Sequence, residues 1–294
     1  MKRISILFLI LLCMLSGCSR REEAQIAATT LPVYEFTTRI VDGTGITVTR
    51  LVTESVSCLH DYSLNVNQVK AAEAAELVVI SGAGLEEFME DILHDKPTVD
   101  ASHGIELLCP EEAHDHDHEH EHEHEGHHHE NDPHIWLSPA NAAAMAENIC
   151  DGLTEQYPEY AEIFRTNLSD LTGELRELQA YGEETLSSLS TRDMITFHDG
   201  FAYFADAYHL HILEAVEEES GSEASARELI HLIGIVEEHS LPAIFTEVNG
   251  SVSAADVIAR ETGAETFALD MAMGGDSWFD AMYNNIDTIK EAMG

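Results

Sequence analysis

A long amphipathic segment in the middle of the chain constrains the fold more than any other feature. Between residues 158 and 189, apolar side chains recur at spacings of 4, 3, 4 and 3, at Phe164, Leu168, Leu171, Leu175 and Leu178. Such spacing predicts one apolar stripe on a helix. At 1.5 Å per residue, a helix of about 30 residues is ~45 Å long. We therefore expect residues 158–189 to form one long helix that joins two lobes.

Strand and helix segments alternate on both sides of this helix. Before it, the pattern predicts strands at 45–52, 77–82 and 97–101 and helices at 65–76 and 85–93, and Pro139 is expected to open a further helix. After it, strands are expected at 193–197, 242–248 and 266–270, and helices at 200–208, 225–239, 253–263 and 278–293. This alternation is typical of mostly parallel sheets covered by helices. The predicted fold class is α/β, with (β/α) lobes at 18–157 and 190–294.

The first residues are typical of a secretory signal. Two basic residues precede an apolar run from Ile4 to Leu15, which is too short to span ~30 Å of hydrocarbon. The sequence "LSGC" at 15–18 resembles a bacterial lipoprotein processing box. We expect residues 1–17 to be a lipoprotein signal peptide and Cys18 to carry the lipid. An ordinary cleaved signal with an incidental cysteine is the alternative.

The chain is strongly acidic, with 55 Asp and Glu against 14 Lys and Arg and a formal net charge of −41. Nucleic acid and anionic lipid surfaces are poor partners for such a chain, and cations are good ones. Cys58, Cys109 and Cys150 are far apart and odd in number, so they predict neither a CxxC metal site nor a disulfide framework. Cys58 precedes His60 by two residues, where it is either a further metal ligand or a plain buried thiol.

Polar side chains stand where several expected strands end. His198 directly follows "MITF", His60 follows "TRLVTES", Glu247 ends "AIFTE", Asp270 ends "TFALD", and His134 lies in "NDPHIWLSP". Ligands of α/β sheets bind beyond the carboxyl ends of the strands. Three histidines and a carboxylate make an N3O set that suits a divalent metal such as zinc. Taken singly, each of these residues is more often a satisfied polar group or a helix cap.

A run at 111–132 contains nine histidines and ten acidic residues. It has no apolar face to bury, so it predicts a loop inserted between folded elements. A solvating acidic spacer explains the carboxylates but leaves the histidines unexplained. Imidazoles with an ordinary pKa of ~6.5 are mostly neutral at pH 7 and able to bind metal. We expect weak accessory zinc binding there, by His114, His116, His118, His120, His122, His124, His127, His128 and His129.

Five blocks of the sequence together resemble one known family. They are "LHDYSLNVNQVKAAEAAELVVISGAGLEEFM", "NDPHIWLSPANAAAMAENI", "ITFHDGFAYFADAYHL", "AIFTEVNGSVSAADVIARETGA" and the closing "LD". In this order they are similar to the signature blocks of ZnuA-like (cluster A-I) metal-binding lipoproteins, which feed ABC transporters. The resemblance covers nearly the whole chain after the signal.

This resemblance implies two (β/α) lobes joined by one rigid helix, with a single metal in the cleft between them. Carried over block by block, it implies that the metal ligands are His60, His134, His198 and Asp270, with Glu247 close to the site. Manganese-binding members of the family have a glutamate at the position of His198. Imidazole favours zinc, whereas manganese prefers oxygen ligands. The other histidines of the folded regions are not expected to bind metal; they are His94, His103, His209, His211, His231 and His239.

The function that the resemblance implies is capture of Zn²⁺ outside the cytoplasm and delivery to an ABC permease and its ATPase. The chain is then a monomeric binding protein that the lipid on Cys18 holds at the membrane. Its location is either the cell surface or the periplasm. A manganese- or iron-binding transporter component and a surface adhesin are the alternatives. A zinc hydrolase is weaker still, because a shell of four protein ligands leaves no open position and Glu247 is the only candidate base.

Overall fold

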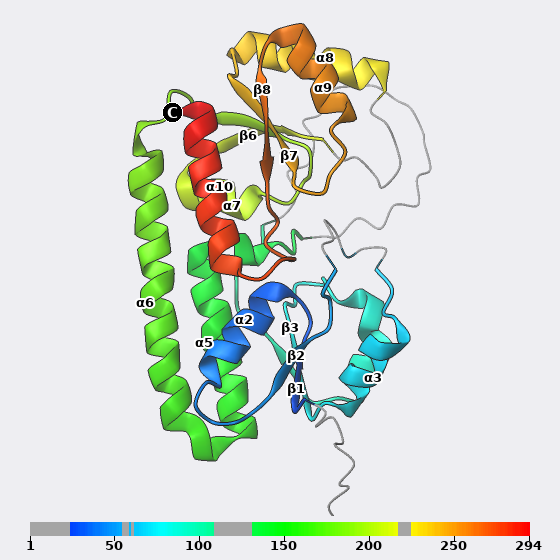
Figure 1. Cartoon of the computed structure of the whole chain (residues 1–294), viewed down its shortest axis with the longest axis vertical. Helices are drawn as coiled ribbons and strands as arrows, with labels where there is room; N and C mark the ends of the chain where they lie inside the picture. The colour runs from blue at the N-terminus through cyan, green and yellow to red at the C-terminus, as the bar shows by residue number, and fades with distance from the viewer. Residues whose placement is uncertain (1–23, 55–58, 60–61, 109–130, 217–224) are drawn as a thin grey trace, which may run out of the picture.

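Two four-stranded parallel sheets lie toward opposite ends of a long helix (Figure 1). The computed structural model describes residues 24–54, 59, 62–108, 131–216 and 225–294. Each sheet has its own helices, and every recorded strand pairing is parallel. The prediction of an α/β chain with two lobes of parallel sheet is confirmed.

The N-terminal sheet has the strand order β2-β1-β3-β4. Its strands are β1 (Ile26–Ala28), β2 (Val48–Arg50), β3 (Leu77–Ile80) and β4 (Thr98–Asp100). The two central strands are buried on both faces, as expected in a parallel sheet covered by helices. The helices of this lobe are α2 (Leu31–Ile40), α3 (Val66–Ala74), α4 (Glu90–Leu93) and α5 (Pro139–Gln156).

Local sequence signals fix the ends of these helices. Asn65 begins α3 with a capping box, in which its side chain accepts backbone N–H groups while Gln68 reaches back to the Asn65 N–H. Ser138 caps α5, whose first residue is Pro139. The helix predicted at 85–93 is shorter than expected, because a 3₁₀ turn at Glu87–Met89 precedes the single turn of α4.

The C-terminal sheet repeats the arrangement with the order β6-β5-β7-β8. Its strands are β5 (Asp193–Thr196), β6 (His211–Ala215), β7 (Ala243–Glu247) and β8 (Glu265–Leu269). Its helices are α7 (Ala202–Tyr208), α8 (Ala226–His239), α9 (Ser253–Thr262) and α10 (Trp278–Met293). In both sheets the carboxyl ends of the strands lead to the region between the lobes (Figure 1).

The predicted long helix is present as α6 (Ala161–Thr185), with 3₁₀ turns at Pro158–Tyr160 and Leu186–Ser188. Its predicted stripe faces the interior, although Leu168 is only partly buried. α6 contacts α2 and α5 of the N-terminal lobe and α7 and α10 of the C-terminal lobe. Gly182 permits the contact with α7, since a Cβ there would lie 2.2 Å from the Tyr208 ring.

The largest hydrophobic core extends through both lobes, and each lobe also has a smaller buried cluster of its own. The largest cluster of buried apolar side chains includes members of α2, α5, α6, α7 and α10. α10 follows the last strand of the C-terminal sheet, yet it runs beside α6 and reaches α2 (Figure 1). Because the core is continuous, the division of the chain at residues 158 and 190 stays a prediction.

Three elements escaped the sequence prediction. β1 has only three residues, too few to show a periodic pattern. α2 has the sequence "LPVYEFTTRI", whose proline stands in the first turn, where it is tolerated, but whose β-branched residues are poor helix formers, so its packing overrides local propensity. β6 is a partly exposed strand at the edge of its sheet. Among the described residues, no helix is both long and apolar enough to cross a bilayer.

Candidate metal site

His134 lies in the turn that leads into α5. Its imidazole is 3 % exposed, and its Nδ1 lies 2.7 Å from Oδ1 of the buried Asp132. The same oxygen accepts the backbone N–H of His134 at 2.9 Å. A carboxylate that faces Nδ1 fixes the proton of a neutral imidazole on that nitrogen. Nε2 is therefore the nitrogen of His134 that would bind a metal.

His198 follows the strand β5 and makes an analogous contact. Its Nδ1 lies 3.5 Å from Oε1 of Glu247, which ends β7 and is 7 % exposed. The Thr196 hydroxyl donates to the backbone carbonyl of His198 at 3.0 Å. A Cβ on Gly200 would lie 2.6 Å from Cδ2 of the imidazole, so only glycine leaves room for the ring there. The Glu247 carboxylate thus lies beside Nδ1 of His198, at a longer distance than the carboxylate of Asp132 from His134.

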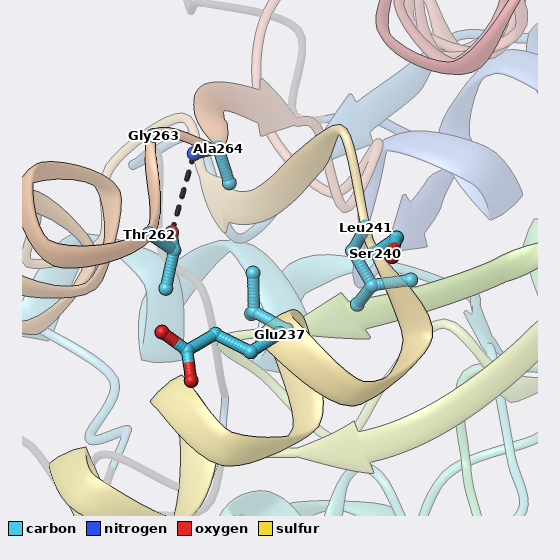
Figure 2. A pocket seen from close by; sticks show the side chains of 7 residues that line it. Glu237, Ser240, Leu241, Thr262, Gly263 and Ala264 are labelled. Carbon is cyan, nitrogen blue, oxygen red and sulfur yellow. Dashed lines mark hydrogen bonds between the residues drawn. The ribbon is translucent and has the colours of Figure 1, made fainter.

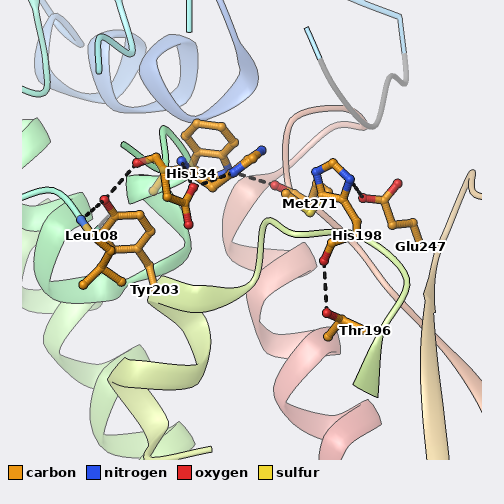
Figure 3. A network of polar contacts seen from close by, with 9 residues as sticks. Leu108, His134, Thr196, His198, Tyr203, Glu247 and Met271 are labelled. Carbon is orange, nitrogen blue, oxygen red and sulfur yellow. Dashed lines mark hydrogen bonds and ion pairs between the residues drawn. The ribbon is translucent and has the colours of Figure 1, made fainter. Parts of the chain in front are cut away.

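The two imidazoles lie against each other across the boundary of the lobes (Figure 3). Their ring centroids are 5.3 Å apart and their planes are at 85°. Two imidazoles bound to one tetrahedral zinc at ~2.1 Å have centroids roughly 5 Å apart. The observed separation therefore suits a shared zinc ion. Trp136 forms an apolar wall, because its fully buried ring lies 5.3 Å from His134 in an edge-on arrangement.

Tyr203 connects α7 to the segment that contains Asp132 and His134. Its hydroxyl donates to the Asp132 carbonyl at 2.9 Å and accepts the Leu108 backbone N–H at 2.9 Å (Figure 3). The Asp132 N–H in turn donates to the Leu108 carbonyl at 2.8 Å. The described residues on both sides of 109–130 are therefore bonded to each other and to the C-terminal lobe.

Asp270 follows β8 and is held mainly through its backbone. The Asn285 side chain on α10 accepts the Asp270 N–H at 2.8 Å and donates to its carbonyl at 2.7 Å. One carboxylate oxygen of Asp270 accepts the Ala272 N–H at 2.8 Å. The next residue, Met271, lies near His198, since a Cβ on Gly200 would approach both side chains at 2.6 Å.

The structure brings together part of the predicted ligand set. His134, His198 and Glu247 are in contact, and Asp270 is adjacent through Met271. Within the described ranges, no three side chains of His, Cys, Asp or Glu stand at metal-binding spacing. His60 lies outside the described residues, as do Cys18, Cys58, Cys109 and the nine histidines between 114 and 129. Cys150 is buried, and this burial raises the pKa of its thiol.

Sequence reasoning missed Asp132 as a partner of His134, because it counted Asp132 among the acidic residues of the loop. The available signal was its position, two residues before the histidine in "NDPH". The roles of Trp136 and Asn285 depend on contacts with residues far away in the sequence, for which the sequence offered no signal.

Another buried carboxylate, Glu86, lies beyond the carboxyl ends of β1 and β3. It accepts hydrogen bonds from the Thr29 hydroxyl at 2.6 Å and from the backbone N–H groups of Ser81 and Gly82 at 2.7 and 3.0 Å. Burial raises the pKa of Glu86 to about 7, although these hydrogen bonds favour the ionised form. Glu86 therefore ties together the loops of the N-terminal lobe.

A pocket on the C-terminal lobe lies away from the imidazole pair (Figure 2). It is found where β7 and β8 begin, whereas Glu247 and Asp270 stand where these strands end. Its lining offers a single carboxylate; the residues are Val236, Glu237, Ser240, Leu241, Thr262, Gly263 and Ala264. This pocket does not have the donors of a metal site.

The long helix, the two parallel sheets and the imidazole pair between them define a two-lobed binding protein. Residues 26–292 match the family described as "ZnuA: Zinc-uptake complex component A periplasmic". The chain belongs to this family.

Relatives and solved structures agree with that assignment. The chain is 30 % identical to the high-affinity zinc uptake system protein ZnuA of Bacillus subtilis, over 95 % of this chain and 90 % of the relative. It is 29 % identical to the zinc-binding protein AdcA of Streptococcus pyogenes over 91 % of this chain, and spans only 56 % of that longer relative. A crystal structure of ZnuA superposes with a TM-score of 0.78 at 28 % identity, covering 92 % of this chain and 100 % of that one.

Proposed function

We propose that this chain captures Zn²⁺ outside the membrane and delivers it to an ABC-type permease and its ATPase. The observation that carries the proposal is the imidazole pair of His134 and His198, with each Nδ1 against a buried carboxylate. Neutral imidazoles fixed in this way are good zinc ligands. Reversible capture also suits a shell made only of protein groups, because no position is left for a reacting water.

The proposed shell is His60, His134, His198 and Asp270, and Glu247 orients His198. The zinc-uptake names of the relatives and the zinc-bound structure of AdcA from Streptococcus pneumoniae support this choice of metal. That structure has a TM-score of 0.74 at 27 % identity and covers 92 % of this chain and 58 % of its own. Three nitrogen donors and one oxygen donor disfavour manganese.

Competition between zinc and manganese tests the proposal. The purified protein should bind one zinc tightly against a chelator, and excess manganese should not displace it. His198→Glu replaces a nitrogen donor with an oxygen donor and should shift the preference toward manganese. Unchanged selectivity in His198→Glu would show that His198 is not a ligand. Tighter binding of manganese by the wild type would favour a manganese transporter component.

The histidine run is proposed to gather or buffer zinc beside this site. Support comes from its nine histidines and from its position just before His134 in the chain. Calorimetry should show one tight site and several weak ones. Deletion of residues 114–129 should remove only the weak class, since the tight ligands lie elsewhere. Loss of the tight site in this deletion would contradict the proposal.

We also propose that a lipid on Cys18 holds the protein at the outer face of the cell membrane. The "LSGC" sequence supports this, and a relative in Streptococcus pneumoniae is named a zinc-binding lipoprotein. Cells fed a labelled fatty acid should label the wild type but not Cys18→Ser. Equal labelling of both would contradict the anchor.

Delivery to a permease predicts that a deletion strain grows slowly in chelated medium and recovers with zinc. Normal growth there, in a strain without a second importer, would favour adhesion or storage.

A further inference from the structure

The connection between β8 and α10 contacts the N-terminal lobe at three points, although it belongs in sequence to the C-terminal lobe. We call residues 271–278 the β8–α10 connection. The Trp136 indole N–H donates to the Met271 carbonyl at 2.7 Å, at the beginning of this connection. Arg50 on β2 donates to the Gly275 carbonyl at 2.8 Å. Three successive points of the connection are thus held from the other lobe, the third being the start of α10.

At that third point, Glu35 on α2 holds the N-terminus of α10. Its Oε2 accepts the backbone N–H of Trp278 at 2.6 Å, where the helix leaves N–H groups unsatisfied. Burial raises the pKa of Glu35, and the Trp278 N–H and the Arg39 charge partly counter this rise. The Trp278 ring is fully buried, and its centroid lies 5.2 Å from that of Phe36 on α2, edge to face. Both polar and aromatic contacts therefore fix the first turn of α10 to α2.

The position of α10 determines where Asp270 lies. Asn285 stands seven residues after Trp278, two turns along the same helix. Its buried amide bonds both the N–H and the carbonyl of Asp270, as described above. A movement of α10 must therefore either move Asp270 or break these two bonds. Glu35 in the N-terminal lobe is connected in this way to a metal ligand of the C-terminal lobe.

The reverse connection runs through Tyr203. This residue belongs to α7 of the C-terminal lobe and is 4 % exposed. Its hydroxyl donates to the Asp132 carbonyl, and the Asp132 carboxylate bonds both the backbone N–H and Nδ1 of His134. Here the C-terminal lobe fixes a ligand of the N-terminal lobe.

We propose that Glu35 and Tyr203 are positioning residues for the metal, through which each lobe fixes a ligand of the other. The inference rests on the proposed function, because it takes His134 and Asp270 as zinc ligands. Zinc–ligand distances must be kept within about 0.2 Å of their preferred values. A shell drawn from two lobes meets this condition only if the lobes are fixed relative to each other. Glu35 and Tyr203 supply that constraint without contact with the metal.

The test measures zinc affinity by chelator competition at less than one equivalent, so that weak sites stay empty. Glu35→Leu removes the acceptor for Trp278 and should weaken binding about tenfold, as loss of a partner that orients a ligand does. Glu35→Gln keeps an acceptor oxygen and should restore affinity to within about twofold of the wild type. Cobalt in place of zinc should show a changed visible spectrum in Glu35→Leu and a wild-type spectrum in Glu35→Gln.

Tyr203→Phe removes a single hydroxyl and keeps the ring. It therefore provides an independent test if Glu35→Leu fails to fold. We expect it to weaken zinc binding severalfold. Tyr208→Phe is its matched control on the same helix, because the buried Tyr208 hydroxyl has no hydrogen-bond partner among the described residues. The control should bind zinc as the wild type does. Equal affinity in Tyr203→Phe and Tyr208→Phe would overturn the proposal for Tyr203.

Double variants separate the inference from the proposed function. Glu35→Leu should cause no further loss of affinity in an Asp270→Ala background, because it acts through Asp270. Tyr203→Phe should likewise cause no further loss in His134→Ala. Fully additive losses would overturn the positioning role and leave the ligand assignment intact. Unchanged zinc binding in Asp270→Ala or in His134→Ala would instead refute the ligand assignment itself.

Discussion

Two groups of histidines and carboxylates lie at opposite ends of the C-terminal sheet. At the carboxyl ends of β5 and β7, His198 faces Glu247 and lies against His134. At the amino ends of β5 and β6, Nδ1 of His211 and Nδ1 of His239 each lie 3.2 Å from a different oxygen of Asp193. Each group therefore contains two imidazoles and one carboxylate.

The two groups differ in burial. In the first group the exposed fractions are 3 % for His134, 7 % for Glu247 and 21 % for His198, whereas in the second they are 34 % for Asp193, 37 % for His239 and 71 % for His211. Burial alone would raise the pKa of Asp193, but hydrogen bonds from the two imidazoles outweigh it and the pKa is lowered. Water solvates the exposed group, and exposed pairs contribute little energy. Contact between histidine and carboxylate is therefore common to both groups, and burial at the boundary of the lobes distinguishes the candidate site.

Removal of one imidazole from each group, in separate variants, should give the largest difference in zinc affinity. His134→Ala should weaken zinc binding more than a hundredfold, because loss of a partner that only orients a ligand already costs 10- to 100-fold. His211→Ala should leave the affinity of the tight site unchanged. Chelator competition on both variants measures the effect. Similar losses in the two variants would remove the distinction between the groups.

Glu86 shows the effect of burial on the pKa of a carboxylate whose hydrogen bonds come from groups other than imidazole. It is buried, and it accepts hydrogen bonds from a hydroxyl and from two backbone N–H groups. Because its pKa is raised from 4.5 to about 7, the folded state binds this proton more tightly than the unfolded state. The stabilisation is complete below pH 4.5 and is lost as the pH rises through about 7.

Chemical denaturation of the metal-free protein between pH 4.5 and pH 8 measures this loss, with Glu86→Gln for comparison. The free energy of unfolding of the wild type should fall relative to that of Glu86→Gln, by on the order of 3 kcal/mol. The constant offset between the two proteins is not informative, since the glutamine amide can accept only part of the three hydrogen bonds. A difference that stays constant across this pH range would show that Glu86 does not titrate as described.

Replacing the aspartate beside a histidine of each group, Asp132 or Asp193, in separate variants should have a smaller effect on zinc affinity. Asp132→Asn weakens the acceptor that fixes Nδ1 of His134 and should reduce zinc affinity 10- to 100-fold. Asp193→Asn should not change it, and should lower the free energy of unfolding at pH 7 by less than about 1 kcal/mol. Unchanged zinc affinity in Asp132→Asn would mean that Nδ1 of His134 needs no carboxylate partner.

Much of the fold could be predicted from the sequence, because hydrophobic periodicity is a local signal. It predicted α6 and most of the alternating strands and helices. It missed β1 and β6, which are short or exposed, and α2, whose residues favour other structures locally. Packing against the shared core, which the sequence does not display, determines α2.

The candidate site also has a part that the sequence could predict and a part that it could not. The positions of His198, Glu247 and Asp270 at strand ends predicted that they lie close together, since the carboxyl ends of parallel strands lie at the same edge of a sheet. The contact between His198 and His134 depends on the relative placement of the lobes, which no local pattern contains. His60 and the histidine run lie outside the described residues, so their roles stay proposals.

Location of bound zinc tests the central claim most directly. Crystals of the protein loaded with one equivalent of zinc can be measured at the zinc absorption edge. The anomalous signal should show one ion about 2.0–2.1 Å from Nε2 of both His134 and His198. A zinc ion at Asp193, His211 and His239, or one bound to neither His134 nor His198, would contradict the account.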